Sequence, residues 1–329
     1  MNLYTSVELP AGLPRLTYAD RLLLLGSCFA AEMGERLLSA KFGCDVNPYG
    51  VLYNPLSISV ALREIEAGRS YGAEDLFLFR ELWHSPMHHG DFSSADKEKV
   101  LETINTRLQE AHAVFSQLDY LLLTFGTAWV YESKETGRVV SNCHKQPETK
   151  FTRRKLSVDE IVLDYKELLS DVLLRNPKLK VLFTVSPIRH VRDGLHANNL
   201  SKATLLLAVE QLQMLFPGHV FYFPAYELLL DELRDYRFYA EDMVHPSKLA
   251  VDYVWERFVH SCISADALQI MEESENIRKS LAHRPFHPES DEYKRFLGQI
   301  VLKIERLNGK YPYLDFKKER EICRIRLKA

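Results

Sequence analysis

The chain has 329 residues, of which 46% are hydrophobic and 26% charged, a composition typical of a globular protein with a sizeable core. No stretch approaches the roughly 20 apolar residues that a membrane span needs, so a membrane partner is not expected. The 42 basic and 45 acidic side chains are spread along the sequence and give a net charge of -3, which leaves no basic field to recruit nucleic acid.

The cysteines predict a reducing, cytoplasmic location. They are five in number and widely spaced, at Cys28, Cys44, Cys143, Cys262 and Cys323, with no CxxC pair. An export signal is an alternative, because Leu25-Gly26-Ser27-Cys28 resembles a lipoprotein cleavage box. However, the apolar run that precedes the box is shorter than the 7 to 15 residues of a signal sequence, and Asp20 comes just before it.

Short apolar runs alternate with longer segments of helical period along the first part of the chain. The predicted strands are Leu22–Leu25 and Asp119–Gly126, and the predicted helices are Phe29–Lys41, Ser57–Ala67 and Lys97–Phe115. Between them, "NPYGVLYNP" at residues 47–55 contains two prolines and a glycine and predicts a long ordered loop.

The same alternation continues through the second part of the chain. The predicted elements are a hairpin at Thr127–Asn142, strands at 180–187 and 219–224, and helices at Val158–Leu174, Leu200–Leu215 and Pro246–Val259. This pattern predicts an α/β domain over residues 1–262, with a central parallel sheet covered by helices. Residues 263–329 are charged, helical in period and without strand candidates, which predicts a C-terminal helical extension that packs on the core or on a partner.

Open parallel sheets bind ligands beyond the carboxyl ends of their strands. Gly26-Ser27, Gly126-Thr127 and Ser186-Pro187 each follow a predicted strand, and "EDMVHPS" at residues 241–247 precedes the last core helix. We therefore expect these four segments to gather at one edge of the sheet.

Serine hydrolysis needs a hydroxyl, a base to take its proton and an acid to orient that base. Asp242 and His245 are three residues apart, so one turn can bring the carboxylate beneath the imidazole. Ser27 lies where a strand passes into a helix, whose free amide groups favour negative charge. The alternative for Ser27 is an ordinary helix cap, and for Asp242 and His245 a surface turn.

Several other polar and aromatic side chains are weaker candidates for ligand contacts. His84, His88, His89 and Asp91 lie within eight positions and could hold a metal, but their spacing fits no standard ligand set. We therefore expect a loop that lines a pocket, with His89 contacting the ligand and with no metal bound.

Three further substrate contacts are expected from loops and from the hairpin. His144 either enters the pocket or braces a polar loop, and Arg189 either anchors an anionic group or is solvated. Trp129 forms an apolar wall with Tyr131, or both rings fill the core.

Five blocks of the chain, taken together, resemble one known family. Gly26-Ser27-Cys28-Phe29-Ala30 is the naming motif of the GSCFA family, and "NPYGVLYNP", "LTFGTAWVY", "NCHKQP" and "DMVHPS" are similar to its other blocks, in order, over roughly residues 1 to 260. That family resembles the SGNH hydrolases, which implies a three-layer α/β/α sandwich of flavodoxin-like type and ester hydrolysis. The resemblance implies Ser27 as nucleophile, with Asp242 and His245 completing the triad, and the backbone of Gly50 as a donor to the oxyanion alongside that of Ser27.

The chain departs from the superfamily pattern at its third block. Gly126-Thr127-Ala128-Trp129 stands where Gly-x-Asn-Asp is usual, so the asparagine that donates its side-chain amide to the oxyanion is absent. The candidates to replace this donor are Thr127, Asn54 and Asn142. Cys28 beside Ser27 is a second potential nucleophile, and we expect it to lie buried beneath the strand because neighbours at a helix start point about 100° apart.

The sequence thus predicts a serine-dependent acyl ester hydrolase or acyltransferase without cofactors, acting on a small acylated substrate such as a carbohydrate ester. One alternative is a non-catalytic carbohydrate-binding module with a degenerate oxyanion hole, and another is an acyltransferase based on Cys28. Phe296, Ile300 and Ile304 form one apolar stripe of the C-terminal segment, which predicts that it caps the core or forms a homodimer.

Overall fold

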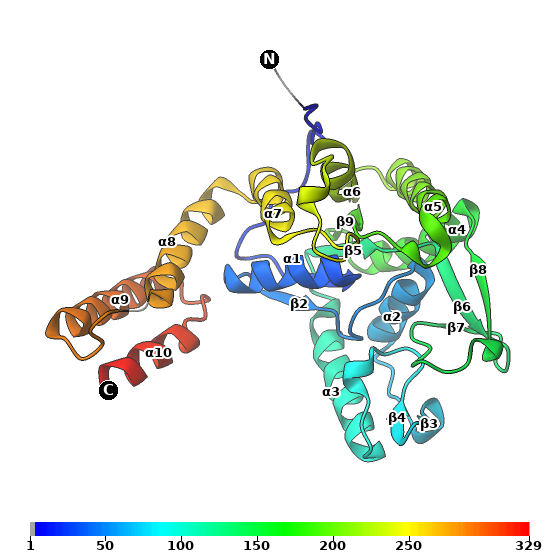
Figure 1. Cartoon of the computed structure of the whole chain (residues 1–329), viewed down its shortest axis with the longest axis horizontal. Coiled ribbons are helices and arrows are strands. Elements are labelled where there is room, and N and C mark those ends of the chain that lie inside the picture. Colours follow the sequence, from blue (N-terminus) through cyan, green and yellow to red (C-terminus); the bar gives the residue numbers. More distant parts are fainter. Residues whose placement is uncertain (1–3, 284, 329) are drawn as a thin grey trace.

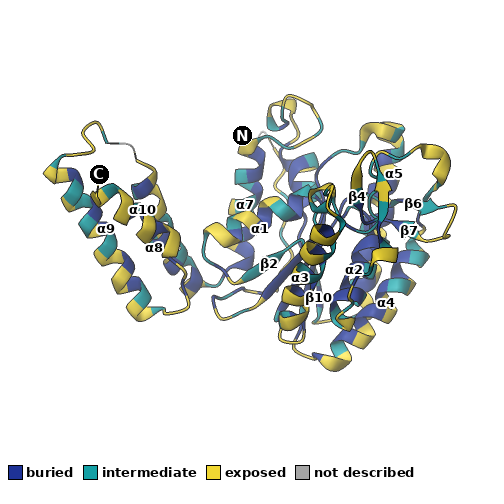
Figure 2. Ribbon diagram, turned by 90° about the horizontal axis from the view of Figure 1, so that it is seen from below, coloured by how far each residue is buried: buried dark blue, intermediate teal, exposed yellow. Residues whose placement is uncertain are grey.

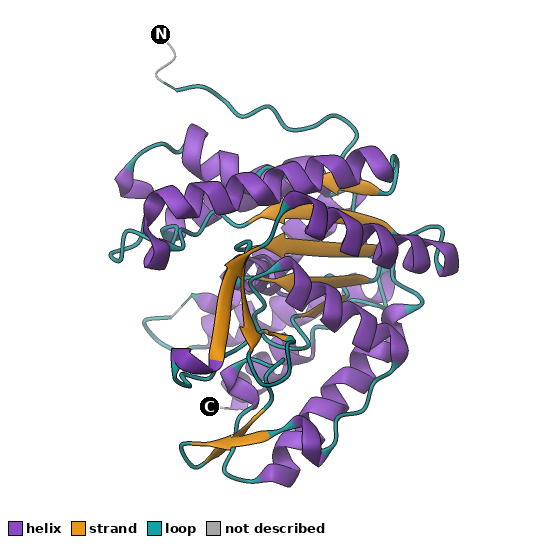
Figure 3. Cartoon of the chain, turned by 90° about the vertical axis from the view of Figure 1, so that its right-hand side faces the viewer, coloured by secondary structure: helices purple, strands orange, loops and turns teal. Residues whose placement is uncertain are grey.

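The computed structural model describes residues 4–283 and 285–328, and its centre is a parallel sheet of five strands. In sheet order these strands are β10 (Val220–Tyr222), β9 (Lys180–Val185), β5 (Tyr120–Phe125), β1 (Leu22–Gly26) and β2 (Cys44–Val46). Figure 3 shows the strands between layers of helices. The predicted parallel sheet is therefore confirmed.

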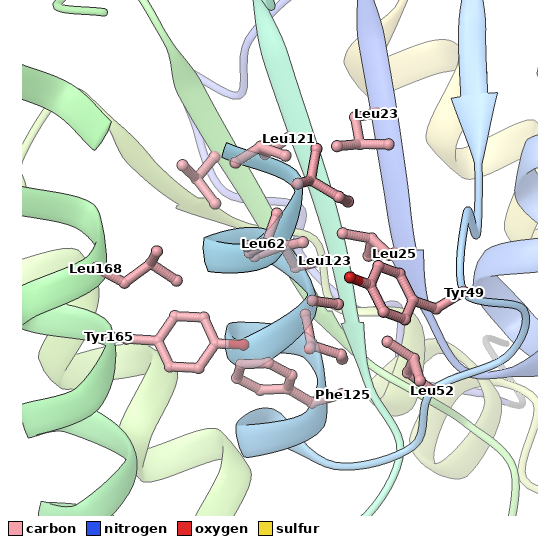
Figure 4. Close-up of a cluster of buried hydrophobic side chains, with 14 of the residues drawn as sticks. Leu23, Leu25, Tyr49, Leu52, Leu62, Leu121, Leu123, Phe125, Tyr165 and Leu168 are labelled. Carbon is pink, nitrogen blue, oxygen red and sulfur yellow. The ribbon is translucent and has the colours of Figure 1, made fainter. Parts of the chain in front are cut away.

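The two faces of the sheet are buried under separate sets of helices. Leu23 and Leu25 of β1 belong to a core cluster with α2 (Pro55–Ala67), α3 (Lys97–Phe115), α4 (Val158–Arg175) and α5 (Gly194–Leu215). Figure 4 shows part of this cluster. Leu22 and Leu24 point to the opposite face, where α1 (Cys28–Ser39) and α7 (Lys248–Cys262) pack. Because side chains alternate along a strand, a run of four leucines supplies both cores of a three-layer α/β/α sandwich.

Two small antiparallel sheets project from the main one. The predicted hairpin appears as β6 (Trp129–Ser133) and β7 (Val139–Val140), and β8 (Phe151–Lys155) pairs with the other side of β6. A second hairpin consists of β3 (Phe77–Phe79) and β4 (Leu82–His84). Shorter helical turns are α6 (Ala225–Glu227), a π-helical turn (Leu228–Glu232) and 3-10 turns at Ala73–Asp75, Gly90–Phe92, Glu148–Lys150, Val191–Asp193 and Tyr236–Phe238.

The C-terminal extension consists of α8 (Ala265–Ala282), α9 (Asp291–Lys310) and α10 (Lys317–Lys328), which extend from the core beyond α7 (Figures 1 and 2). The stripe of Phe296, Ile300 and Ile304 packs within the chain's own apolar cluster. Lys41 Nζ, just after α1, forms a largely buried ion pair of 2.7 Å with Glu319 on α10. The extension thus touches the core at this ion pair, and its packing on the core or on a partner, including a homodimer, stays a prediction.

Some element boundaries differ from those that the sequence predicts. The last core helix begins at Lys248 with Ser247 as its cap, whereas Pro246 forms an isolated bridge with Tyr239. The prediction that Pro246 opens this helix is therefore wrong by two residues, because a serine cap competes with proline for the helix start. In the described residues, no helix is long and apolar enough to cross a membrane.

Candidate active site

Ser27 stands at the junction of β1 and α1, and its backbone position is set by Gly26. Gly26 has φ +148°, and a Cβ there would lie 2.3 Å from the Thr124 carbonyl oxygen of the neighbouring strand. Only glycine fits at this point, where β1 passes close to β5 before the chain turns into the helix. Ser27 follows in extended conformation as the N-cap residue of α1 and is 1% exposed.

The Ser27 hydroxyl does not serve as a helix cap. Its side chain makes no capping hydrogen bond, and within residues 4–283 and 285–328 its Oγ has no hydrogen-bond partner at all. A buried hydroxyl without a partner costs free energy, which makes Ser27 a candidate for a functional role. The Oγ also lies at the positive end of α1, which favours an anion.

Asp242 and His245 form the predicted pair on the loop before α7. His245 Nδ1 and Asp242 Oδ2 are hydrogen-bonded at 2.6 Å, and Asp242 Oδ1 accepts the backbone N–H groups of Val244 and His245, each at 2.9 Å. These bonds, with the His245 amide first, lower the pKa of Asp242 to about 2. The side chains are 49% (His245) and 50% (Asp242) exposed, so hydrogen bonds rather than packing hold the pair.

Ser27 and His245 line one cavity of about 400 Å³. The cavity also includes four other predicted site residues, namely Asn54, Thr127, Trp129 and Arg189. Asp242 supports His245 from outside this lining, and Gly50, His89, Asn142 and His144 are not among the lining residues. The structure therefore brings together the ends of β1, β5 and β9 with the loop before α7, as the sheet-edge rule requires.

Most of the predicted oxyanion donors are already engaged in hydrogen bonds, including the Thr127 hydroxyl, which is bonded to Ser201 Oγ at 3.1 Å. The N–H of Ser27 donates to Thr124 O at 3.3 Å, that of Gly50 to Asn47 O at 2.7 Å and that of Thr127 to Tyr53 O at 2.9 Å. The Asn54 side chain caps α2 by bonding the amide and hydroxyl of Ser57, at 2.8 and 2.9 Å. Asn142 Oδ1 accepts the backbone N–H of His144 at 2.8 Å.

The histidines of "LWHSPMHHGD" at residues 82–91, together with His144, form hydrogen bonds and contacts that hold the loops of this region in place. His84 bonds Ser93 Oγ at 2.7 Å, His88 bonds Ser85 Oγ at 2.8 Å, and His144 bonds Ser85 O at 2.8 Å. His89 packs against Gly50, where a Cβ would lie 2.3 Å from that of His89. Over the described ranges, no group of three or more His, Cys, Asp or Glu side chains is arranged to hold a metal ion.

One wall of the cavity joins two predicted residues, Trp129 and Tyr131, to Arg153, which the sequence patterns do not single out. Arg153 on β8 stacks over the rings of Trp129, at 4.6 Å, and Tyr131, at 5.2 Å, and is paired with Asp193. Arg189 lies 4.1 Å from the Tyr239 ring. Recognition of β8 as the third strand of this small sheet would have placed Arg153 opposite Tyr131.

Beneath the cavity lies a fully buried lysine, Lys202 of α5. Its Nζ donates to Gly126 O at 2.7 Å and to Ser186 O at 2.6 Å, which ties together the chain just after β5 and β9. Burial lowers the pKa of this ammonium to about 7. A lysine in an otherwise ordinary helical segment carried no signal for this role in the sequence.

Cys28 faces the same cavity as Ser27, with its Sγ 3.5 Å from the Tyr53 hydroxyl. The expectation that Cys28 is buried beneath the strand is therefore wrong, since its side chain is half-buried at the first position of α1 and lines the pocket.

The fold and this edge define a three-layer α/β protein with a cavity at the carboxyl ends of its parallel strands, containing a serine and a histidine–aspartate pair. A model of the GSCFA family matches residues 21–258, and a model of the GSCFA domain protein C-terminal domain matches residues 274–329. The chain therefore belongs to the GSCFA family. A comparison with curated proteins found no significant match.

Proposed function

We propose that this protein is an acyl ester hydrolase or acyltransferase that works through an acyl-enzyme on Ser27. The observation that carries the proposal is that the partnerless, buried Ser27 hydroxyl lines the same cavity as His245, whose Nδ1 is bonded to Asp242. A carboxylate in that position fixes the tautomer that leaves Nε2 free to accept a proton.

In the proposed mechanism, Ser27 Oγ attacks the acyl carbon while its proton passes to His245 Nε2. The tetrahedral intermediate then collapses, the alcohol leaves with that proton, and water or an acceptor hydroxyl releases the acyl group by the reverse steps. Ser27 Oγ has no hydrogen-bond partner among the described residues, so the proton transfer to His245 requires one of the two side chains to move into hydrogen-bonding distance of the other.

The proposed substrate is a small acylated molecule, such as a carbohydrate ester. The Trp129 and Tyr131 rings with Arg153 form a flat wall suited to a sugar ring. Arg189 lines the cavity and faces tyrosine rings, which suits it to anchor a polar or anionic group.

The test compares the parent with Ser27→Ala on p-nitrophenyl esters of increasing acyl length, with fluorophosphonate labelling mapped by mass spectrometry. We expect labelling of Ser27 and a loss of about 10⁴-fold or more in kcat in the variant. The matched control is Ser290→Ala, which removes the cap of α9 in the C-terminal extension, a part of the described chain that gives the cavity no lining residue. Equal turnover by parent and Ser27→Ala would rule the mechanism out.

A second candidate is a Cys28-based acyltransferase, which the exposure of Cys28 to the cavity favours. Iodoacetamide inactivation that persists in Ser27→Ala, together with loss of turnover in Cys28→Ala, would support it. Binding of carbohydrates without turnover of any ester would instead support a non-catalytic module.

A further inference from the structure

The missing asparagine leaves Thr127 as the side-chain candidate of the third block, and its hydroxyl is bonded to Ser201 Oγ at 3.1 Å. The backbone amides expected at the oxyanion site are bonded to carbonyl oxygens. An acyl oxygen that becomes negative near Ser27 needs donors that are already in place and not engaged elsewhere. A polar hydrogen beside Ser27 that lacks a partner in the structure would meet this need.

His190, five residues after β9, offers such a group in the tautomer that carries its proton on Nε2. Its backbone N–H donates to Asn198 Oδ1 at 2.9 Å, and its ring packs edge-on against Tyr53 with centroids 5.9 Å apart. Its Nε2 is buried, and among the described residues it has no hydrogen-bond partner. The imidazole lines the cavity of Ser27 and His245.

The position of Gly126 shows how near His190 is to the serine. A Cβ on Gly126 would lie 3.4 Å from His190 Nε2 and also 3.4 Å from Ser27 Cβ. His190 Nε2 and Ser27 Cβ are thus separated by no more than the sum of these two distances. Two polar groups without partners, Ser27 Oγ and His190 Nε2, therefore share one small region of the cavity.

Burial, together with the surrounding charges, keeps the ring of His190 neutral. Burial contributes most, and the positive charges of Lys202, His245 and Arg153 add to it, while Asp193 acts in the opposite direction; together they lower the pKa of His190 to about 4. A neutral imidazole carries one N–H and can donate a hydrogen bond to a developing oxyanion without giving up its proton.

We propose that the Nε2–H of His190 donates to the oxyanion and takes the place of the missing asparagine. This inference rests on the proposed function. As the bond from Ser27 Oγ to the acyl carbon forms, the carbonyl electron pair moves onto the acyl oxygen, which accepts the hydrogen bond from His190. The serine proton goes to His245, and His190 neither gains nor loses a proton.

A role for His190 as the base is less well supported by the contacts. His245 has a carboxylate on its Nδ1, whereas no side-chain hydrogen bond to the His190 ring occurs in the described part of the chain. A low pKa also makes His190 a weak acceptor but leaves it a competent donor.

The experiment uses a matched pair of variants, His190→Gln and His190→Met. The two side chains have similar length and volume, but only glutamine can donate from the position of Nε2. We expect His190→Met to lower kcat on a p-nitrophenyl ester by about 10²- to 10³-fold with little change in KM, and His190→Gln to recover most of that loss. His196→Met, at an exposed histidine of α5, is the control.

Two further measurements separate a donor from a structural role. Affinity for an alkyl trifluoromethyl ketone, which forms a tetrahedral oxyanion on serine, should fall in His190→Met in parallel with kcat/KM. Melting temperatures of the Gln and Met variants should be alike. Equal activity of these two variants would overturn the proposal, as would loss in His190→Met of the acidic limb of the pH–rate profile, which would make His190 the base.

The failure of this inference is distinguishable from failure of the proposed function. If the parent turns over no ester and fluorophosphonate does not label Ser27, the proposed function fails and His190 has no oxyanion to bind. If the parent is active and Ser27→Ala is not, yet His190→Met matches the parent, only the role of His190 is overturned.

Discussion

The serine and the histidine of the proposed triad are held by very different surroundings. Ser27 is buried where a core strand meets a helix, and Gly26 before it is pressed against Thr124 of the neighbouring strand. The Asp242–His245 pair is half exposed on a loop and is fixed by hydrogen bonds within the loop. The nucleophile is thus positioned by the packing of the whole core, and the base by a few local bonds.

This contrast gives a rule for mutations. Changes around Ser27 should lower stability and activity together, because the same contacts serve both. Changes within the His245 loop should lower activity and leave the free energy of unfolding almost unchanged.

The largest effect is expected for Gly26→Ala. The new Cβ would meet the Thr124 carbonyl at 2.3 Å, and alanine is strained at φ +148°. We expect a loss of about 3 kcal/mol in the free energy of unfolding and no measurable esterase activity.

Denaturant unfolding and ester hydrolysis test this variant beside Gly12→Ala, where φ is +81° but no atom lies within 4 Å of the added Cβ. The control carries backbone strain alone and should lose less stability. A Gly26→Ala protein as stable and active as the parent would contradict the role given to the β1–β5 contact.

The next effect is expected for Asp242→Asn, which should lower kcat by about 10²- to 10⁴-fold at unchanged melting temperature. The asparagine oxygen can still accept the amides of Val244 and His245, but its NH₂ group no longer selects the reactive tautomer of His245. Steady-state kinetics and thermal melts provide the test. A lower melting temperature with unchanged kcat would contradict the expectation that changes in the His245 loop affect activity and not stability.

The low pKa of Asp242 makes a prediction for the pH dependence of the reaction. Asp242 has a pKa of about 2, so it stays ionised as the pH falls through the mildly acidic range. Asp242 therefore contributes no acidic limb of kcat/KM in that range, so any such limb of the parent should persist in the residual activity of Asp242→Asn. Loss of the limb in this variant would contradict the low pKa of Asp242.

A subtler effect is expected beneath Ser27, from Lys202. Its pKa of about 7 in the folded chain lies below the ordinary 10.5, so the unfolded chain binds the proton more tightly between these values. The parent should therefore gain stability as the pH rises from about 7 to about 10, and Lys202→Met should lack this gain. Denaturant midpoints across that range test it, and parallel curves for both proteins would contradict it.

The smallest effect compares two serines at the same helical position. Ser247 caps α7 by accepting the Ala250 amide at 3.3 Å, whereas Ser27 caps nothing on α1. We expect Ser247→Ala to cost about 1 kcal/mol and Ser27→Ala to cost almost no stability. Equal melting temperatures of the two variants would contradict the expectation that Ser247 stabilises its helix as a cap and Ser27 does not.

The sequence predicts the main sheet well because its signals are local. The apolar runs of β1, β5 and β9 and the 19-residue helix α3 can be recognised from periodicity alone. β2, β8 and the β3–β4 hairpin are missed because they are short or partly exposed, so they lack a continuous apolar run.

The site is only partly readable from the sequence for a related reason. Sequence patterns suffice to place three site residues at the carboxyl edge of the sheet. Ser27 follows strand β1, and Asp242 and His245 precede helix α7. Arg153 and Lys202 reach the site through long-range packing, which no pattern of neighbouring residues records. His190 follows β9 in the segment that the sheet-edge rule places at the site, but its lack of a hydrogen-bond partner appears only in the folded chain. Hydrogen bonds that engage Gly50 and Thr127 likewise appear only once the chain is folded.

Helix α10 contacts the chain just after α1 through the Lys41–Glu319 pair, and among the described residues the cavity takes no lining residue from beyond His245. Figure 1 shows α10 remote from the β6–β8 sheet. A fluorophore or a solid support attached through α10 should therefore leave the entrance clear, so that immobilised protein can be assayed with bulky acyl donors.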